Sequence, residues 1–547
     1  MEVLVETKDD TLSPFANSIY KSKYAMERNG RTEEWPETAE RVVKNVLGVL
    51  GYTEEDSEYK RLVQLIAERK FIPGGRYLYS AGRELHQVNN CFLVYAEDSR
   101  EGWADLLKKA AMVLQTGGGL GVEYSGIRPY GSPIRKTGGI ASGPISLMQM
   151  VNEIGRGVIQ GGFRRSALIA LLDWNHGDIQ KFIRAKDWHE DIRSAKEKDF
   201  NSMAHMDMTN ISVNLDDEFF QKMDSGDKSA SDVYHKVIDK MVSTGEPGFS
   251  INLEEFASEK ARNPCGEVVS ADDSDCCNLG SINIAKIKDV IEFEEVIDLA
   301  ILFLLAGTVY SDVPYDKVKN VRNKNRRIGL GLMGVHEWLL KRGKKYGKDS
   351  ELQEWLELYA ESWRPALDYS QKHKLSIPIA TRSIAPTGSI GILAETTTGI
   401  EPIFCVAYKR RYLSDGQQWK YQYVVDPTAN RLINEGVDPH AIEDAYSLSY
   451  DVERRVDFQA WIQQYVDMGV SSTINLPEPI HNEKEAKEFG DMLYPYLTKL
   501  RGITAYPNGA RGGQPLVPST YDEAIKHVGV VFEEDPEASC SNGVCGA

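Results

Sequence analysis

Short apolar runs that alternate with helical segments fill most of this 547-residue chain, and this alternation limits the folds that it can adopt. The alternation begins at Phe71, where glycine also becomes frequent. Residues 167–172 and 281–284 have the composition of buried strands, and residues 291–306 form a largely apolar run that predicts a helix packed on several sides. Strands and helices that alternate in this way are typical of an α/β fold with a mostly parallel sheet.

The two ends of the chain differ in character from its middle. Pro36 opens a run to residue 50 with valine and leucine at helical spacing, and residues 58–70 repeat the pattern. We therefore predict an N-terminal helical lobe at residues 1–70 and one large α/β domain at residues 71–506. The sequence then shows turn signals and ends in small and acidic residues, which predict a loop and a mobile tail at residues 507–547.

Composition and charge exclude several classes of protein. With 41% hydrophobic and 27% charged residues, the chain has an ordinary globular composition. A net charge of −17 makes its surface a poor match to a polyanion, so no nucleic-acid partner is expected. No apolar run approaches the roughly 20 residues that span a bilayer, and residues 1–10 lack the features of a signal peptide. The seven cysteines are few and odd in number, which argues against a secreted disulfide scaffold and favours the reducing cytoplasm.

The run Asn-Pro-Cys-Gly-Glu at residues 263–267 carries the strongest chemical signal in the chain. A proline before the cysteine and a glycine after it favour a stiff, tight turn, which can hold the Cys265 thiol at a fixed point. Asn263 and Glu267 flank this thiol with an amide and a carboxylate, a combination suited to proton and hydrogen-atom chemistry. The alternative is a buried cysteine in an ordinary turn.

Other cysteines bear on that choice. Cys91 follows two asparagines, and Cys277, itself preceded by Cys276, leads into Asn-Leu-Gly-Ser, so that both positions look like the start of a strand. Vicinal cysteines rarely bond each other, so at least one of the two is free for a distant partner, which the sequence alone does not identify. Cys540 and Cys545 are separated by four small or polar residues on a flexible end, so they form a thiol pair that can reach other sites. The alternative for this pair is half a zinc site, although no second Cys or His pair lies nearby in the sequence.

Three glycine-rich segments suit the recognition of phosphate or of a base. Residues 116–121 lack the Lys-Ser/Thr end of a P-loop and are a weak signal. Residues 385–390, Ala-Pro-Thr-Gly-Ser-Ile, offer hydroxyls and free amides at a predicted helix start, where anions bind; the alternative is a capped helix without a ligand. Residues 161–166 combine flexibility with the guanidinium groups of Arg164 and Arg165; the alternative is a solvated basic turn.

Together, and in order along the chain, these segments resemble those of the catalytic subunit of ribonucleotide reductases. The run around Cys265 looks like the finger loop of that family, whose cysteine becomes a thiyl radical. Residues 90–92, Asn-Cys-Phe, and the strand after Cys277 look like its two redox-cysteine strands. Residues 386–389, followed by Gly-Ile-Glu-Pro at 399–402, look like its substrate phosphate loop, and the C-terminal cysteine pair looks like its shuttle arm.

Other segments resemble the adenosylcobalamin-dependent, oxygen-indifferent class of this family, namely residues 138–144, 164–167 and 499–506. The iron-dependent class carries two adjacent tyrosines near its C-terminus to relay a radical, and this chain contains no Tyr-Tyr pair. The anaerobic class carries a glycyl-radical motif near its end, and residues 528–530, Val-Gly-Val, are not one. The resemblance therefore implies adenosylcobalamin as the cofactor. The chain lacks an Asp-x-His-x-x-Gly motif, so no protein histidine is expected to ligate cobalt through that motif, and no metal-binding residue is assigned.

The resemblance implies both a fold and a reaction. The fold is a ten-stranded α/β barrel of two antiparallel five-stranded halves, with the finger loop threaded through its centre. The reaction replaces the 2′-hydroxyl of a ribonucleotide with hydrogen, after a thiyl radical on Cys265 has taken the 3′ hydrogen atom of the ribose. Glu267 is implied as the general base on the 3′-hydroxyl, and Asn263 as a hydrogen-bond partner of the sugar hydroxyls. Cys91 and Cys277 are implied to deliver the reducing equivalents and to end as a disulfide.

The resemblance also implies partners and further site residues. Cys540 and Cys545 would reduce that disulfide by exchange, and thioredoxin or a similar donor would reset them. The implied substrate-binding residues are Asn90, Gly119, Ser142, Ala385, Pro386, Thr387, Gly388 and Ser389. The implied loop for a deoxynucleoside triphosphate effector comprises Gly161, Gly162, Phe163, Arg164, Arg165 and Ser166. Both a monomer and a homodimer are compatible with the resemblance.

Two other functions are alternatives at this point. One is a ribonucleotide reductase subunit that receives its radical from a metal-containing partner subunit. The other is a non-catalytic protein that binds a nucleotide or zinc. Uptake of cobalamin would favour the adenosylcobalamin-dependent enzyme, whereas stoichiometric zinc would favour the last alternative. The sequence does not distinguish diphosphate from triphosphate substrates.

Overall fold

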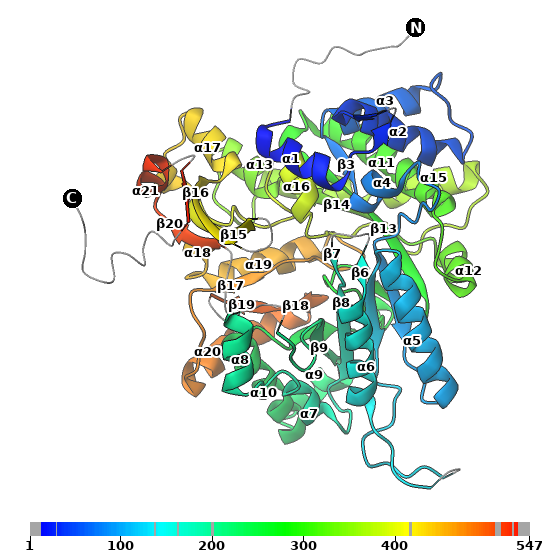
Figure 1. Ribbon diagram of the computed structural model, residues 1–547, viewed down its shortest axis with the longest axis vertical. Helices are drawn as coiled ribbons and strands as arrows, with labels where there is room; N and C mark the ends of the chain where they lie inside the picture. The colour runs from blue at the N-terminus through cyan, green and yellow to red at the C-terminus, as the bar shows by residue number, and fades with distance from the viewer. Residues whose placement is uncertain are drawn as a thin grey trace.

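The computed structural model describes residues 12–28, 30–135, 138–160, 164–198, 202–414, 418–508, 516–527 and 530–533. Helices cover the outside of a central set of strands, and the N-terminal helices lie together at the top of the view in Figure 1. The predicted α/β class is confirmed, because long helices and strands alternate through most of the chain.

One half of the central strands is a parallel group of five. They are β4 (Cys91–Tyr95), β5 (Gly119–Glu123), β8 (Leu168–Asp173), β9 (Thr209–Leu215) and β10 (Gly248–Ile251), paired in that order. Parallel neighbours need long crossover connections. Here α5 (Arg100–Gln115), α6 (Pro144–Gly157) and α10 (Lys228–Thr244) lie in three of them.

The other half begins with two parallel strands, β13 (Asp275–Asn283) and β14 (Ile328–Met333). Two parallel bridges continue it, from Leu330 to Arg382 and from Ile384 to Val470. The parallel pair β17 (Ile474–Leu476) and β19 (Ala505–Pro507) completes it.

Antiparallel pairings join the two halves on both sides. β13 pairs with β4, so that Cys277 lies opposite Cys91, and β10 pairs with β18 (Gly502–Ile503). The pairings therefore follow a ring of two parallel halves that run in opposite directions, while the ten-stranded barrel that the resemblance implies stays a prediction. Among the described residues the largest regular sheet has nine strands, because the later pairings of the second half are single bridges or belong to a separate short sheet.

Side chains on the strands alternate between two environments, as the pleat of a strand requires. In β4, Phe92 and Val94 point outward into a core shared with the surrounding helices. Cys91 and Leu93 belong to a smaller buried cluster that also contains Cys277. The chain thus has apolar cores outside the strands and one small core between the two halves.

The N-terminal helices pack on the second half. α2 (Trp35–Gly48) and α3 (Ser57–Ala67) share one core with α11 (Val290–Tyr310), β13 and β14. The helices expected at residues 36–50, 58–70 and 291–306 are therefore present, with ends shifted by a few residues. The domain boundaries after residues 70 and 506 stay predictions.

A small antiparallel sheet lies beside the main fold, at the left of Figure 1, and the sequence analysis missed it. It joins the hairpin of β15 (Ala407–Ser414) and β16 (Gln418–Val425) to β20 (Leu516–Ser519) and β21 (Val531–Phe532). Aromatic and polar residues alternate between residues 418 and 423, which was a readable strand signal.

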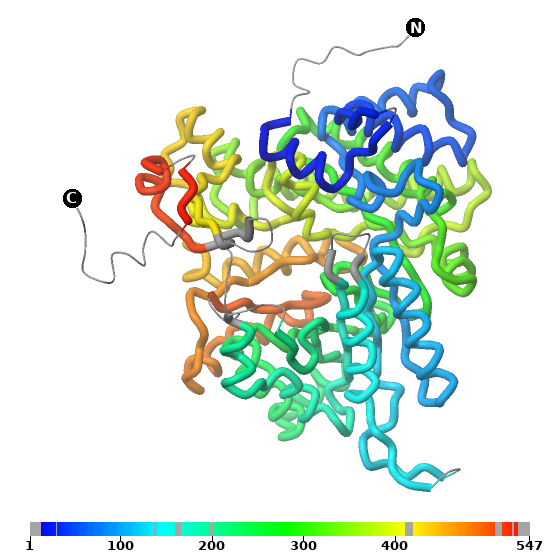
Figure 2. The backbone as a smooth tube through the Cα atoms, in the orientation of Figure 1, coloured from blue at the N-terminus to red at the C-terminus, as the bar shows by residue number. Residues whose placement is uncertain are grey.

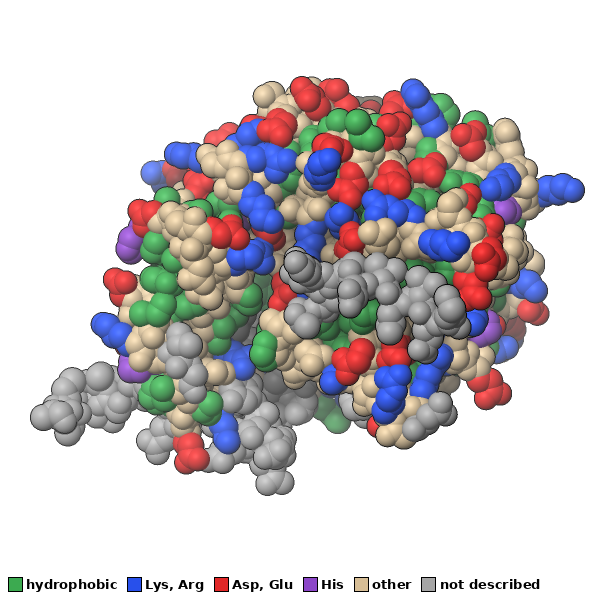
Figure 3. All heavy atoms as spheres, turned by 90° about the horizontal axis from the view of Figure 1, so that it is seen from above, with side chains coloured by type: hydrophobic (Ala, Val, Ile, Leu, Met, Phe, Trp, Pro, Cys, Tyr) green, Lys and Arg blue, Asp and Glu red, His purple; other side chains and the backbone are tan. Residues whose placement is uncertain are grey.

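The exterior of the molecule carries charges of both signs and a projecting loop (Figures 2 and 3). On the face seen in Figure 3, acidic and basic side chains are interspersed and no large patch of one sign appears. Within the described part of the chain, no helix has both the length and the apolar character needed to cross a bilayer. The loop between β5 and α6 projects from the bottom of the backbone tube in Figure 2.

Candidate active site

The Cys265 run forms the tip of a hairpin between the two halves. Its stem pairs β11 (Ala261–Arg262) with β12 (Val269–Ser270). In the tip, the Gly266 amide donates to the Asn263 carbonyl at 2.9 Å, and Gly266 has φ +83°, a conformation that favours glycine. The Asn-Pro-Cys-Gly-Glu run is therefore the tight turn that the sequence predicted.

Two glycines of the surrounding strands allow the hairpin to come close. A Cβ atom at Gly121 in β5 would lie 1.7 Å from the Arg262 carbonyl oxygen. A Cβ atom at Gly469 would lie 2.4 Å from the Gly266 carbonyl oxygen. Both approaches are to backbone atoms, so only glycine fits at these two positions. The first half and the second half thus each contribute one surface against which the hairpin rests.

Buried polar groups fix the stem of the hairpin. The Tyr95 hydroxyl donates to the Ser270 carbonyl at 2.9 Å and accepts from the Ala261 amide at 3.2 Å, so it bridges both strands of the stem. The buried Arg262 guanidinium donates to the Ser250 hydroxyl at 3.0 Å and to the Gly266 carbonyl at 2.9 Å. These contacts leave little freedom to the turn that carries the thiol.

Four of the five predicted catalytic residues, Asn263, Cys265, Glu267 and Cys91, line one cavity of about 340 Å³, whereas Cys277 is not among its lining residues. Residues 385–389 line the same cavity. Asn90 and Gly119, both predicted to bind substrate, also line it. The cavity thus brings a thiol, a carboxylate and an amide together with the segment predicted to hold phosphate.

Asn263 is the centre of the hydrogen bonds in this cavity. Its Nδ2 donates to Glu267 Oε2 at 2.8 Å and to Cys91 Sγ at 3.0 Å, while its Oδ1 accepts from the Val268 amide at 2.9 Å. The Glu267 carbonyl in turn accepts from the Gly469 amide and the Ser383 hydroxyl, both at 2.8 Å. The amide therefore orients the carboxylate, and the backbone of the carboxylate residue is tied to the second half.

Burial controls the protonation of the cavity. It raises the pKa of Glu267 to about 7, while the hydrogen bond from Asn263 acts in the opposite direction. Burial raises the pKa of the Cys91 thiol. The walls of the cavity also raise the pKa of the Cys265 thiol, although this residue is exposed at the hairpin tip, and the nearby Glu267 carboxylate adds to both effects. Near neutral pH the thiols are therefore protonated, whereas Glu267 can both take up and release a proton.

Cys91 and Cys277 lie directly opposite each other on adjacent antiparallel strands. Both are buried in the same small core between the two halves. Cys276 points to the other face of β13, where it packs among the helices of the first half. The strand pleat thus separates the vicinal pair and leaves Cys277 as the one that faces Cys91.

The 385–389 segment leads into α16 (Gly388–Ala394), which begins where the sequence predicted a helix start. Thr387 Oγ1 accepts from the Gly399 amide at 2.8 Å, so the two runs of the predicted phosphate loop are in contact. Ser142 is not brought to this cavity. It lines a separate cavity near the start of α6, together with Tyr130 and Lys181.

The predicted effector loop is only partly described. Gly161, Gly162 and Phe163 lie outside the described residues. The backbone of Arg164 and Arg165 forms β7 (Arg164–Arg165), which pairs with β6 (Ile159–Gln160). Ser166 is buried, its hydroxyl donates to the Val158 carbonyl at 3.0 Å, and the next residue, Ala167, lines the cavity of Cys265. Cys540 and Cys545 also lie outside the described residues.

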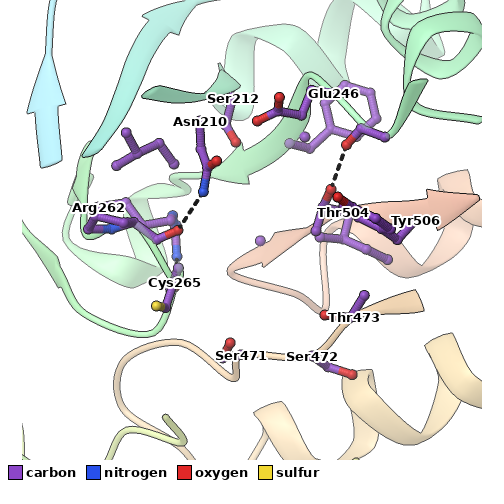
Figure 4. Close-up of a pocket in the computed structure, with 18 of the residues that line it drawn as sticks. Asn210, Ser212, Glu246, Arg262, Cys265, Ser471, Ser472, Thr473, Thr504 and Tyr506 are labelled. Carbon is purple, nitrogen blue, oxygen red and sulfur yellow. Dashed lines mark hydrogen bonds between the residues drawn. The ribbon is translucent and has the colours of Figure 1, made fainter. Parts of the chain in front are cut away.

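A second cavity of about 300 Å³ lies on the other side of the hairpin tip, and Cys265 lines this one too. Figure 4 shows polar side chains around it from both halves, with Asn210 and Ser212 on one side and Ser471 and Thr504 on the other. Asn210 Nδ2 donates to the Pro264 carbonyl at 3.3 Å and so links this cavity to the turn. No group of three or more His, Cys, Asp or Glu side chains within the described ranges is placed to hold a metal ion.

Comparison with known proteins agrees with this geometry. The family model described as "Ribonucleotide reductase, barrel domain" matches residues 89–231, 225–362 and 356–506, most of the chain. The chain belongs to the ribonucleotide reductase barrel-domain family. The alpha subunit of the class Id ribonucleotide reductase of Actinobacillus ureae has the same fold, with a TM-score of 0.71 at 17% identity over 92% of this chain and 98% of that one.

Curated relatives of this reductase chain carry more specific names. A protein of Thermoplasma acidophilum named vitamin B12-dependent ribonucleoside-diphosphate reductase is 28% identical, over 84% of this chain and 66% of its own length. A protein of the same name from Mycobacterium tuberculosis strain CDC 1551 is 26% identical, over 94% and 82%. A protein of Mycobacterium phage D29, named as a candidate adenosylcobalamin-dependent ribonucleoside-triphosphate reductase, is 25% identical over 97% and 98%.

Sequence reasoning missed some residues of this reductase cavity. Tyr24, Gly75 and Arg76 line it beside the predicted residues. The Arg76 guanidinium donates to the Thr116 carbonyl at 2.6 Å, which places it at the weak glycine-rich segment of residues 116–121. Tyr24 directly follows α1 (Pro14–Lys23), and Gly75 and Arg76 begin α4 (Gly75–Ser80). None of them belongs to a motif that the sequence analysis used. Only the fold shows that they reach the cavity.

Proposed function

We propose that the protein reduces ribonucleotides to 2′-deoxyribonucleotides by thiyl-radical chemistry, with Cys265 as the radical carrier. The observation that carries this proposal is that Cys265, Glu267, Asn263 and Cys91 line one cavity together with residues 385–389. Membership of the ribonucleotide reductase family and the names of the three curated relatives support the same reaction.

Each cavity residue has a role in this chemistry. A ribose bound over Cys265 presents its 3′ hydrogen atom to the thiyl radical, which takes it and becomes a thiol again. Glu267 accepts the proton of the 3′-hydroxyl, a task that suits a carboxylate with a pKa of about 7. Asn263 hydrogen-bonds the sugar hydroxyls and keeps Glu267 oriented. Cys265 is exposed at the tip of the hairpin, so bound substrate and cofactor must keep water and other quenchers away from the radical.

Cys91 and Cys277 supply the two reducing equivalents. The 2′-hydroxyl leaves as water, hydrogen takes its place, and the two sulfur atoms end as one disulfide, so atoms and electrons balance. The 3′ hydrogen atom then returns from Cys265, which regenerates the thiyl radical. Directly opposite residues of antiparallel strands have Cα atoms about 4.5 to 5.5 Å apart, which is within the range that a disulfide spans.

The second cavity suits the adenosyl part of adenosylcobalamin, the cofactor named for the relative from Mycobacterium phage D29, while the other two relatives are named for vitamin B12. The side chains of Asn210, Ser212 and Thr504 offer hydrogen bonds to a ribose and a base. Ser472 Oγ lines this cavity, is buried, and has no hydrogen-bond partner among the described residues. When bound, adenosylcobalamin supplies the radical that oxidises the Cys265 thiol. Because Cys265 lines both cavities, one thiol serves the cofactor side and the substrate side.

The remaining assignments rest on the resemblance to the family. Residues 161–166 respond to a deoxynucleoside triphosphate effector, and Cys540 and Cys545 exchange with the buried disulfide and with thioredoxin or a similar donor. A thiol cycle of this kind suits the reducing cytoplasm. Both substrate types occur in the relatives' names, since two are diphosphate reductases and one is a triphosphate reductase.

Turnover of the purified protein tests the proposal. With a ribonucleotide, a dithiol and adenosylcobalamin, the chain alone should form deoxyribonucleotide, with or without oxygen. Cys265→Ser should bind nucleotide and yet form none, because a hydroxyl is a far poorer hydrogen-atom carrier than a thiol. Product formation by this variant well above background would reject the radical assignment, and a requirement for a metal-containing partner subunit would reject the cofactor.

A further inference from the structure

Helix α1 (Pro14–Lys23) lies antiparallel to α16, beside the segment predicted to hold phosphate (Figures 1 and 2). At one end the Ser13 amide donates to Glu395 Oε1 at 3.2 Å, and Arg69 holds the other oxygen of that carboxylate at 2.7 Å. At the other end Lys23 Nζ donates to the Ser389 hydroxyl at 3.4 Å. The last residues of α1 are therefore fixed next to residues 385–389.

Tyr24 follows directly and reaches into the substrate cavity. Its side chain lines that cavity, and the residue is only 3% exposed. A Cβ atom at Gly75 would lie 2.9 Å from Tyr24 Oη, so glycine at this position leaves the room that the phenol occupies. The hydroxyl is buried and has no hydrogen-bond partner among the described residues. A buried hydroxyl without a partner is unfavourable, so this oxygen is placed for a partner that the described residues do not provide.

The Lys23 side chain makes this end of α1 suitable for an anion, although the helix end alone is not. The carbonyl end of a helix carries partial negative charge and would repel a phosphate. Lys21 and Lys23 occupy the last turn of α1, but they point to different partners. Lys21 pairs with Glu34 at 3.3 Å on the exposed surface, whereas Lys23 reaches Ser389. Lys23 thus brings an ammonium group to the exposed edge of the phosphate segment, where it can offset the helix end.

We propose that Lys23 and Tyr24 bind the outermost phosphate group of the substrate nucleotide, so that α1 forms one wall of the active site. The inference rests on the proposed function only in taking a nucleoside 5′-phosphate as the ligand. Lys23 lies at the exposed edge of residues 385–389, whereas Cys265 and Glu267 line the same cavity from the hairpin between the two halves. A nucleotide with its sugar over Cys265 therefore directs its last phosphate towards Lys23 and Tyr24.

Nucleotide binding by single-residue variants tests this assignment. Wild type, Tyr24→Phe and Lys23→Ala are compared by calorimetry with cytidine mono-, di- and triphosphate, without adenosylcobalamin. The reference ligand is whichever of the diphosphate and the triphosphate wild type binds more tightly. Each substitution should weaken binding of that nucleotide by about tenfold, the effect of losing one charged hydrogen bond. Binding of the monophosphate should be unchanged. Lys21 lies in the same last turn of α1 but pairs with Glu34. Lys21→Ala is therefore the matched control and should bind all three nucleotides as wild type does.

Stability separates a lost contact from a damaged fold. Tyr24→Phe removes an oxygen that has no partner among the described residues, so the thermal midpoint should not fall. Unchanged binding in both variants, or equal weakening for the mono-, di- and triphosphate, would overturn the assignment. Phosphate-dependent weakening in a protein that forms no deoxyribonucleotide would reject the proposed function alone. An active wild type whose variants bind normally would reject this inference alone.

Discussion

At the scale of single residues, Glu267 shows what the sequence could and could not supply. The carboxylate was recognisable because it stands two residues from Cys265 in one tight turn. Its pKa of about 7 was not, because that value follows from burial between segments that are distant in sequence. Tyr24 and Arg76 were missed for the same reason, since their place in the cavity depends on how the N-terminal segment packs.

Substitution of Glu267 by glutamine should abolish the proton transfer and keep the hydrogen bond to Asn263. We expect deoxyribonucleotide formation to fall by about 10²- to 10⁴-fold, the usual contribution of a general base. In wild type, the acidic limb of the rate profile should have its midpoint near pH 7, because only the deprotonated carboxylate accepts a proton. A profile without a limb between pH 6 and 8 (about one unit on either side of that pKa) would contradict the assignment.

The same pKa gives an independent control through stability. Burial raises the pKa of Glu267 from 4.5 to about 7, so between these values the folded state keeps a proton that the unfolded state releases. The free energy of unfolding should therefore decrease as pH rises through this window, by about 3 kcal/mol from this residue. Denaturant titrations of wild type and Glu267→Gln should differ by that slope, because the amide does not titrate.

At the scale of elements, local sequence patterns predicted the type of each segment better than its contacts. The helices around α2, α3 and α11 were predicted from apolar spacing, and β8 from its apolar run. β13 was expected as a strand start at Cys277 and a buried run at residues 281–284, but not as one strand from Asp275, because Asp, Cys and Asn are poor local strand signals. Pairing with β4 on one side and β14 on the other stabilises this strand, so tertiary contacts decide its length.

Gly121 is a strand residue whose size should determine whether the Cys265 hairpin fits. In Gly121→Ala, the new methyl group would lie 1.7 Å from the Arg262 carbonyl oxygen, so the hairpin must move. We expect a loss of about 1 to 3 kcal/mol in the free energy of unfolding, as for overpacking, together with a large drop in turnover. Gly48→Ala, at an exposed position with no atom within 4 Å of the added Cβ, is the matched control. Wild-type activity of Gly121→Ala would show that the hairpin does not need this close approach.

At the scale of the whole molecule, the closure of the strands into a ring was the part least accessible from the sequence. Its two seams join β13 to β4 and β10 to β18, strands that are far apart in the chain and carry no pairing signal. The α/β class follows from local patterns, whereas this closure is a set of long-range contacts. It came instead from the resemblance to a family, which the matched family model supports over residues 89–506.

The buried position of Cys91 and Cys277, the proposed redox pair, leads to the last prediction. Cys91 and Cys277 are 4% and 0% exposed, so a protein such as thioredoxin cannot contact a disulfide between them. Disulfide exchange requires direct attack of one sulfur on another, so a second thiol pair must carry the electrons. The Cys540→Ser/Cys545→Ser double variant should therefore lose multiple turnovers with thioredoxin and keep a single turnover from prereduced enzyme. It should also keep much of its activity with dithiothreitol, which is small enough to enter the cavity.

Product per enzyme is measured with each reductant, and Ser541→Ala, which keeps both cysteines, serves as the matched control. Full thioredoxin-driven turnover by the double variant would show that another route reduces the buried pair.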